Sequence, residues 1–180
     1  MGMAVSVPRY TIDDLDRFPD DGNRYELLDG VLLVTPAPSV AHQAIATRLA
    51  TQLSVATSGY AQVVGPGAIA VPPGTQLQPD ILVIPARFPL DSKWQDITEH
   101  WLAVEVLSRS SRMYDREFKR DAYFALGVVE VWLVDLGDRS LEVCRSRGPG
   151  EIVRDTIRWR VPEHDQVVVL DLGEVFAGLS

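Results

Sequence analysis

The stretch WLAVEVLS, residues 101–108, decides the fold because it is short, strongly apolar and contains one charge. Six of its eight side chains are apolar, a pattern typical of a strand that is buried on both faces of a sheet. Glu105 stands in the middle of the run, where a carboxylate without a partner is strongly destabilising. The stretch therefore predicts a central strand and a compensating group for Glu105, either a structural arginine or a functional cation.

Length and composition are those of a globular protein. The chain has 180 residues, with 46% hydrophobic and 23% charged side chains, which predicts a single domain over residues 1–180, with 1–9 as a flexible N-terminal segment. No apolar run is long enough to span a membrane. The net charge of −8 argues against bulk attraction to nucleic acid. One cysteine, Cys144, cannot form an internal disulfide, which favours a cytoplasmic location.

The order of the predicted elements indicates the fold class. Residues 24–35 predict a hairpin with a type I′ turn at Asp29-Gly30, and residues 39–59 predict a helix with Ser39 as its N-cap. Strands are expected at 80–84, 101–108, 128–135 and 140–146, in IVRDTIRW and in QVVVL, with helices at 111–126 and after Asp171. This order predicts an α/β or α+β fold with a mixed central sheet flanked by helices.

Asp80 begins the apolar strand that precedes WLAVEVLS, and consecutive short strands are often neighbours in a sheet. If Asp80 and Glu105 lie close together, a cation is needed between them, and Mg²⁺ or Mn²⁺ prefers such oxygen ligands. Lys119 falls near the core-facing side of the next helix, among Asp115, Phe118, Ala122 and Leu126. The alternatives are a strand-start or turn residue at Asp80 and a surface lysine at position 119 whose stem lies along the protein.

Two further polar residues fall on apolar faces. Alternation along the hairpin places Glu26 with Leu28, Val31 and Leu33. His42 opens the inward stripe of the 39–59 helix. The alternatives are that Glu26 lies on a solvated hairpin edge and that His42 is a half-exposed helix residue.

With Asp80 after Gln78-Pro79 and Glu105-Val106-Leu107 on the following strand, the chain resembles the PD-(D/E)XK nuclease superfamily. Within it, the chain resembles the bacterial restriction-endonuclease-like group that was long catalogued as a domain of unknown function. The resemblance spans roughly residues 10–178. It is carried by RYELLDGVLLV, the SVAHQ helix start, QPDILV, LAVEVLSRSSRMYDREFKRDAYFALGVVEVWLVD and the terminal strand with its helix.

The sequence departs from the superfamily pattern at Leu107, which occupies the position of the expected lysine. The resemblance implies that Lys119, on the following helix, takes over that role. It also implies that Asp80, Glu105 and the Val106 carbonyl ligate Mg²⁺ or Mn²⁺. The remaining implied site residues are Glu26 and His42 in the pocket, with His42 as a proton acceptor or metal ligand, and Asp115 behind the metal ligands.

The leading hypothesis is a metal-dependent endonuclease that hydrolyses DNA phosphodiester bonds with a metal-activated water. Arg109, Arg112, Arg116 and Arg120 are candidate phosphate contacts, or else a solvated helix face. Superfamily resemblance also implies a possible homodimer. The alternative is a catalytically silent nucleic-acid-binding or regulatory module on the same fold. A purely structural or interaction domain, with Trp94, Trp101 and Trp132 as packing or interface anchors, leaves Asp80, Glu105 and Lys119 unexplained.

Overall fold

The computed structural model of the chain describes residues 8–107 and 115–179. Residues 1–7 of the predicted flexible segment lie outside this range. The strands are β1 (Arg24–Leu28), β2 (Val31–Thr35), β3 (Ala61–Val64), β4 (Ile69–Val71), β5 (Thr75–Leu77), β6 (Ile81–Pro85), β7 (His100–Leu107), β8 (Val128–Asp135), β9 (Ser140–Cys144), β10 (Glu151–Val153), β11 (Thr156–Arg160) and β12 (Val167–Asp171). The helices are α1 (Ile12–Leu15), α2 (Val40–Ala56), the 3₁₀ turn η1 (Trp94–Asp96), the π-helix η2 (Asp115–Lys119), α4 (Arg120–Ala125) and α5 (Leu172–Val175).

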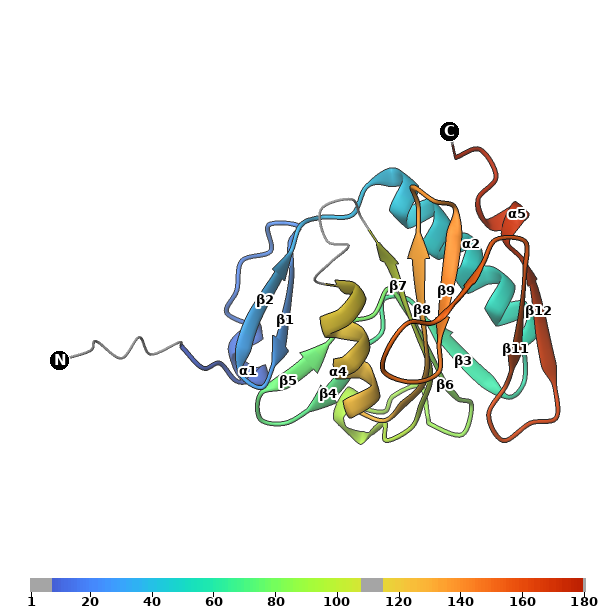
Figure 1. The fold of residues 1–180 in the computed structure, drawn as a ribbon. Coiled ribbons are helices and arrows are strands. Elements are labelled where there is room, and N and C mark those ends of the chain that lie inside the picture. The colour runs from blue at the N-terminus through green and yellow to red at the C-terminus, as the bar shows by residue number, and fades with distance from the viewer. Residues whose placement is uncertain (1–7, 108–114, 180) are drawn as a thin grey trace.

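The strands form a mixed central sheet and two smaller sheets (Figure 1). The central sheet has six strands in the order β10-β9-β8-β7-β6-β3. β7 and β8 run parallel, as a crossover containing α4 allows, whereas the other neighbouring strands of this sheet run antiparallel. A four-stranded sheet has the order β2-β1-β5-β4, and β11 pairs with β12. The predicted fold class, a mixed central sheet flanked by helices, is confirmed.

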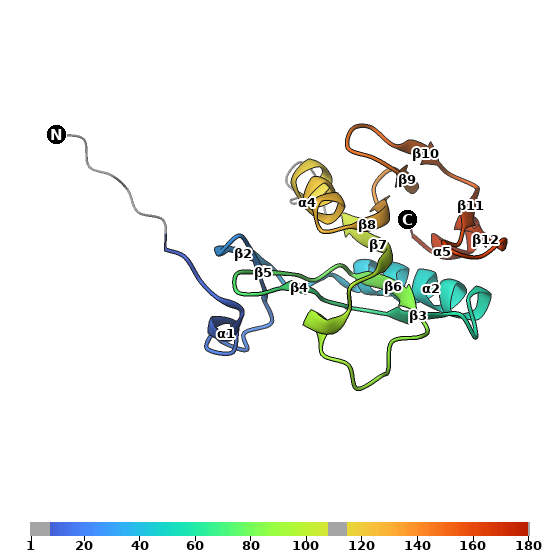
Figure 2. The ribbon, with the colours of Figure 1, turned by 90° about the horizontal axis from the view of Figure 1, so that it is seen from below.

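Two layers cover opposite faces of the central sheet, as Figure 2 shows. One face packs against α2, α5 and the β11–β12 hairpin, through side chains that include Val104 and Val106. The other face packs against α4 and the four-stranded sheet, through side chains that include Ala103 and Leu107. Because side chains alternate along a strand, Glu105 points to the same face as Ala103 and Leu107, toward α4 and β1.

Several local predictions are confirmed. β1 and β2 pair from Arg24 opposite Thr35 to Leu28 opposite Val31, and both Asp29 and Gly30 have positive φ, as a type I′ turn requires. Ser39 caps α2 by accepting a hydrogen bond from the His42 N–H. IVRDTIRW, however, contributes two strands, β10 and β11, that belong to different sheets.

Trp101 and Trp132 are buried in the core that includes α2, and Trp94 is 36% exposed. Trp101 and Trp132 therefore serve as packing residues, which was one of the two roles considered for them. In the described part of the chain, no helix combines the length and the apolar character needed to cross a membrane.

Candidate active site

The sheet register brings Asp80 and Glu105 together. β6 and β7 are antiparallel with Ile81 opposite Val104, so Asp80, directly before β6, lies beside Glu105. Both side chains are buried, with 6% and 4% exposure. The prediction that these carboxylates come from neighbouring strands is confirmed. Asp80 is also a strand-start residue, as the alternative interpretation had it, but it is buried beside Glu105.

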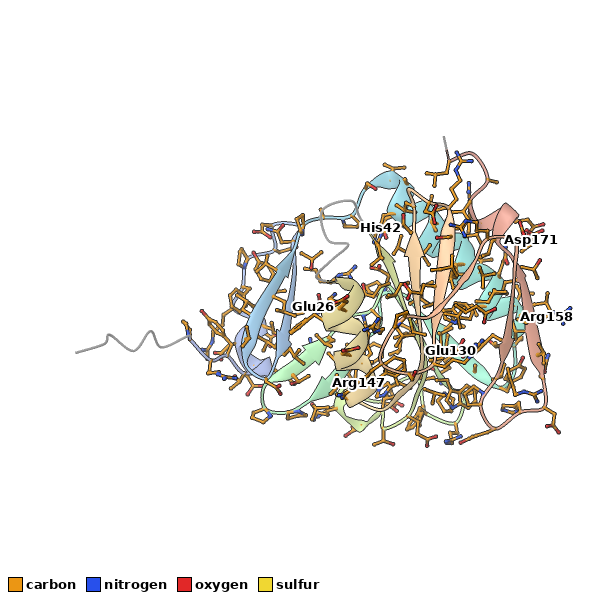
Figure 3. The ribbon with its side chains drawn as sticks, viewed as in Figure 1. Glu26, His42, Glu130, Arg147, Arg158 and Asp171 are labelled. Atoms are coloured by element: carbon orange, nitrogen blue, oxygen red, sulfur yellow. The ribbon has the colours of Figure 1, made fainter. Side chains whose placement is uncertain are left out.

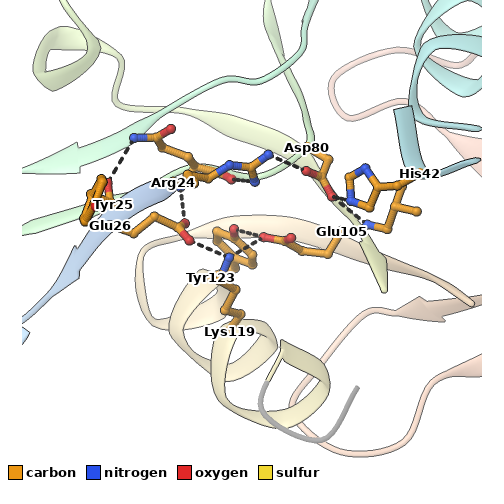
Figure 4. Close-up of polar contacts among 10 residues, drawn as sticks. Arg24, Tyr25, Glu26, His42, Asp80, Glu105, Lys119 and Tyr123 are labelled. Atoms are coloured by element: carbon orange, nitrogen blue, oxygen red, sulfur yellow. Dashed lines mark hydrogen bonds and ion pairs between the residues drawn. The ribbon is translucent and has the colours of Figure 1, made fainter. Parts of the chain in front are cut away.

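Lys119 reaches the surroundings of the same two carboxylates from the helix that follows β7 (Figure 4). Its Nζ lies 2.8 Å from Glu26 Oε2 and 3.3 Å from Glu105 Oε1, and only 2% of the residue is exposed. Glu26 is fully buried, and its Oε1 accepts a hydrogen bond from the Gln78 N–H at 2.7 Å. Glu26 therefore does not lie on a solvated edge, and Lys119 is a buried ion-pair partner of two carboxylates.

The predicted inward stripe of this helix is only partly correct. Phe118 is 40% exposed, whereas Lys119, Ala122 and Tyr123 are buried. The π-helix η2 explains the difference, because its wider turn shifts the residues around the helix axis relative to an α-helix. The backbone of Asp115 belongs to η2, but its side chain is outside the described structure, so its predicted role behind the metal ligands stays a prediction.

Tyr123 is a site residue that the sequence reasoning missed. It is fully buried on α4, and its hydroxyl donates a hydrogen bond to Glu105 Oε1. Burial and the nearby charge of Glu105 raise the pKa of Tyr123 well above its ordinary value, so the hydroxyl remains a donor. The available signal was its position four residues after Lys119, which puts both on one side of a helix.

Arg24, also missed, holds the other carboxylate. Its guanidinium donates to Asp80 Oδ1 at 2.8 Å and to the Gln78 carbonyl at 2.9 Å. Asp80 Oδ2 accepts from the Val106 N–H at 2.8 Å and lies 3.1 Å from His42 Nε2. Burial alone would raise the pKa of Asp80, but the hydrogen bond from His42 and the charge of Arg24 outweigh it and lower that pKa.

Glu105 is electrostatically different from Asp80. Burial, opposed by the Lys119 charge and assisted by the charges of Asp80 and Glu26, raises the pKa of Glu105 to about 8. Its Oε1 takes the contacts from Lys119 and Tyr123, and no hydrogen bond from the described residues reaches its Oε2. Among the contacts of the described residues, one oxygen of Glu105 is thus left for a further ligand.

His42 lies at the first turn of α2, where the Ser39 cap fixes the helix start. Its Nε2 contacts Asp80, while its buried Nδ1 has no hydrogen-bond partner among the described residues. A neutral imidazole that donates from Nε2 would leave Nδ1 as an acceptor. His42 is therefore buried at the site rather than half-exposed on the helix surface.

The predicted phosphate contacts are only partly described. Arg109 and Arg112 lie outside the described residues, as does the side chain of Arg116. Arg120 is buried to 7% exposure, and its Nε lies 2.9 Å from Asp121 Oδ1. Contact between these arginines and phosphate stays a prediction. Arg120 suits it poorly, because its side chain is buried and pairs with Asp121.

A buried carboxylate does not by itself mark the site. Glu130 on β8 is also buried, yet it accepts hydrogen bonds from Trp132 Nε1 at 2.6 Å and Arg145 Nε at 3.1 Å. Figure 3 shows Glu130 well apart from Glu26 and His42. Glu130 has the structural role that was one interpretation of Glu105, and Glu105 differs by its convergence with Asp80, Glu26 and Lys119.

The donor set suits a metal with few protein ligands. Within the described ranges, no three His, Cys, Asp or Glu side chains form a ready metal cluster. Mg²⁺ commonly keeps several waters and uses one or two carboxylates. Asp80 and Glu105 provide two. When a bound cation favours the ionised form of Glu105, the carboxylates Glu26, Asp80 and Glu105 outnumber the cations Lys119 and Arg24 among the described residues. The residues therefore fit such an ion.

Comparisons with known proteins concern the fold and the family of the chain. The crystal structure of a putative nuclease belonging to DUF820, from Anabaena variabilis ATCC 29413, has the same fold, with a TM-score of 0.73 at 17% sequence identity. The match covers 94% of this chain and 99% of that one. The comparison with curated proteins gave no match. Residues 12–180 match the family Uma2, described as putative restriction endonuclease, and the chain belongs to this family.

Proposed function

We propose that this protein is an endonuclease that uses Mg²⁺ or Mn²⁺ to hydrolyse DNA phosphodiester bonds. The observation that carries the proposal is the convergence of Asp80, Glu105 and Lys119 from three separate elements into one buried network. Family membership supports nuclease activity. The metal and the DNA substrate are inferred from the chemistry of the site.

Asp80 and Glu105 would hold the metal ion. Glu105 offers Oε2, and each oxygen of Asp80 keeps acceptor capacity beyond its hydrogen bonds, because a carboxylate has about four acceptor positions. The Val106 carbonyl is a further candidate ligand. A bound divalent ion would supply Lewis acidity toward a phosphoryl oxygen and a water molecule.

The remaining groups supply charge and proton transfer. Lys119 holds an ammonium group between Glu26 and Glu105, where it can stabilise negative charge developing on a phosphate. Glu26 orients that ammonium group from the opposite side. His42 Nδ1, which lacks a hydrogen-bond partner among the described residues, can accept a proton from a water molecule.

Plasmid cleavage with Mg²⁺ or Mn²⁺ tests the proposal. Wild type should nick or linearise the plasmid, and Asp80→Ala and Lys119→Met should each lower the rate by about 100-fold or more, in the range found for loss of one transition-state-stabilising group. Arg17→Met is a control, because Arg17 is exposed just after α1 and pairs only with nearby Asp14 among the described residues. Equal cleavage by wild type and both site variants would overturn the proposal.

One observation favours a second candidate, a nucleic-acid-binding or regulatory module without catalysis. Both oxygens of Asp80 already have partners in Arg24, the Val106 N–H and His42, so the pocket is partly neutralised without a metal. Calorimetric titration with Mn²⁺ separates the two functions. Binding that disappears in Glu105→Gln but persists in Glu130→Gln supports the nuclease, whereas absence of binding to wild type supports the silent module.

A further inference from the structure

The two oxygens of Glu105 have different surroundings. Oε1 is approached by Lys119 Nζ and by the Tyr123 hydroxyl, whereas no hydrogen bond from the described part of the chain reaches Oε2. A carboxylate without contacts can rotate about its last side-chain bond and exchange its oxygens. The contacts at Oε1 restrict this rotation and determine which oxygen is left for a further ligand.

Lys119 is not sufficient for this task. Its Nζ is closer to Glu26, at 2.8 Å, than to Glu105, at 3.3 Å. In the proposed reaction Lys119 also has to stabilise charge on the phosphate, which competes with its contact to Glu105. A second donor to Oε1 keeps Glu105 oriented when the lysine turns toward the substrate.

Tyr123 is well placed to be that donor. Its ring is fully buried and belongs to the core cluster that contains Ala103, Leu107 and Leu133, on the α4 side of the central sheet. This packing fixes the ring, and a tyrosine side chain has few rotatable bonds. Glu105 Oε1 is thus held by a rigid group that is anchored in the core.

We infer that Tyr123 is a positioning residue of the proposed nuclease, whose hydroxyl holds Oε1 of Glu105 so that Oε2 is presented to a divalent cation. This inference rests on the proposed function. Hydrogen bonds to metal-ligating carboxylates typically contribute 10- to 100-fold in metal affinity or activity. The effect should be clear for Mg²⁺ and Mn²⁺, because Mg²⁺ in particular demands a near-ideal ligand geometry.

Tyr123→Phe tests the inference, because it removes the hydroxyl and keeps the packed ring. Calorimetric titration with Mn²⁺ in the absence of DNA should show about 10-fold weaker binding than wild type. Plasmid cleavage by Tyr123→Phe should fall at low Mn²⁺ and recover when Mn²⁺ is raised above the weakened dissociation constant. A purely structural defect would not recover in this way.

Tyr60→Phe is the matched control, since the Tyr60 hydroxyl donates to the Ala56 carbonyl, away from the pocket. Thermal unfolding of both variants checks that they remain folded at the titration temperature. If wild type and Tyr123→Phe bind Mn²⁺ equally, the role of Tyr123 is refuted while the nuclease proposal stands. If wild type neither binds Mn²⁺ nor cleaves the plasmid, the proposed function fails, and this inference fails with it.

Discussion

Glu105 shows how single residues connect sequence to chemistry. Its position in an apolar strand predicted an unusual environment, and its burial, raised pKa and contacts with Lys119 and Tyr123 confirm that environment. Arg24 and Tyr123 escaped prediction for a physical reason. An arginine at a strand start and a tyrosine in a helix are ordinary in their local context, and only the packing of β1 and α4 gives them their carboxylate partners.

A second buried residue makes stability depend on pH. His100, at the start of β7, is 5% exposed, and neither ring nitrogen has a hydrogen-bond partner among the described residues. Burial, weakly opposed by the charge of Glu99, lowers the pKa of His100 to about 4. The unfolded chain takes up this proton near pH 6.5, but the folded chain only near pH 4. Protonation thus favours unfolding as pH falls between these values.

We therefore expect His100→Phe, which cannot be protonated, to lose less stability on acidification. The difference between wild type and variant should grow by about 3 kcal/mol from pH 7 to pH 4, the free-energy equivalent of the pKa shift. Urea unfolding at a series of pH values measures it. If the free energies of unfolding of the two proteins change in parallel with pH, the prediction that His100 is buried in its neutral form is contradicted.

At the scale of elements, local signals predicted well and non-local ones did not. The Asp29-Gly30 turn, the Ser39 cap and the apolar strands were predictable because neighbouring residues determine them. The shift at η2 was not, because an α-helical period was assumed across a π-helix. IVRDTIRW crosses between sheets, and its hydrogen-bond partners, β9 and β12, are set by the tertiary fold.

The β1–β2 turn should be sensitive to substitution because β1 carries Glu26. Gly30 has φ +77°, its N–H and carbonyl bond to Gly74 and Tyr10, and an added Cβ would lie 3.2 Å from the Tyr10 carbonyl oxygen. Gly30→Ala should lower the free energy of unfolding by more than the roughly 1–2 kcal/mol that a left-handed conformation alone costs a residue with a Cβ. Gly59 has φ +93° with nothing within 4 Å, so Gly59→Ala should lose only that amount. If urea unfolding shows equal stability losses for Gly30→Ala and Gly59→Ala, the close approach to Tyr10 has no destabilising effect.

On the scale of the whole molecule, the charged network lies where three parts of the fold meet. Glu26 comes from the four-stranded sheet, Glu105 from the central sheet and Lys119 from the end of η2, directly before α4. The site therefore cannot assemble until these parts have packed together. The same charges that serve the proposed chemistry also hold the layers together. One substitution should therefore change both activity and stability, whereas a second, compensating substitution can restore stability without restoring activity.

Lys119→Met should reveal this separation, because it leaves two buried carboxylates without their shared cation. Removing one partner of a buried ion pair costs about 3–5 kcal/mol, which for a chain of this size lowers the melting temperature by on the order of 10 °C. Adding Glu26→Gln removes one uncompensated charge, so the double variant should regain part of this stability but none of the cleavage activity. Thermal unfolding and plasmid cleavage measure the two effects. If the stability loss of the double variant equals the sum of the losses in Lys119→Met and Glu26→Gln, then Glu26 and Lys119 are not coupled.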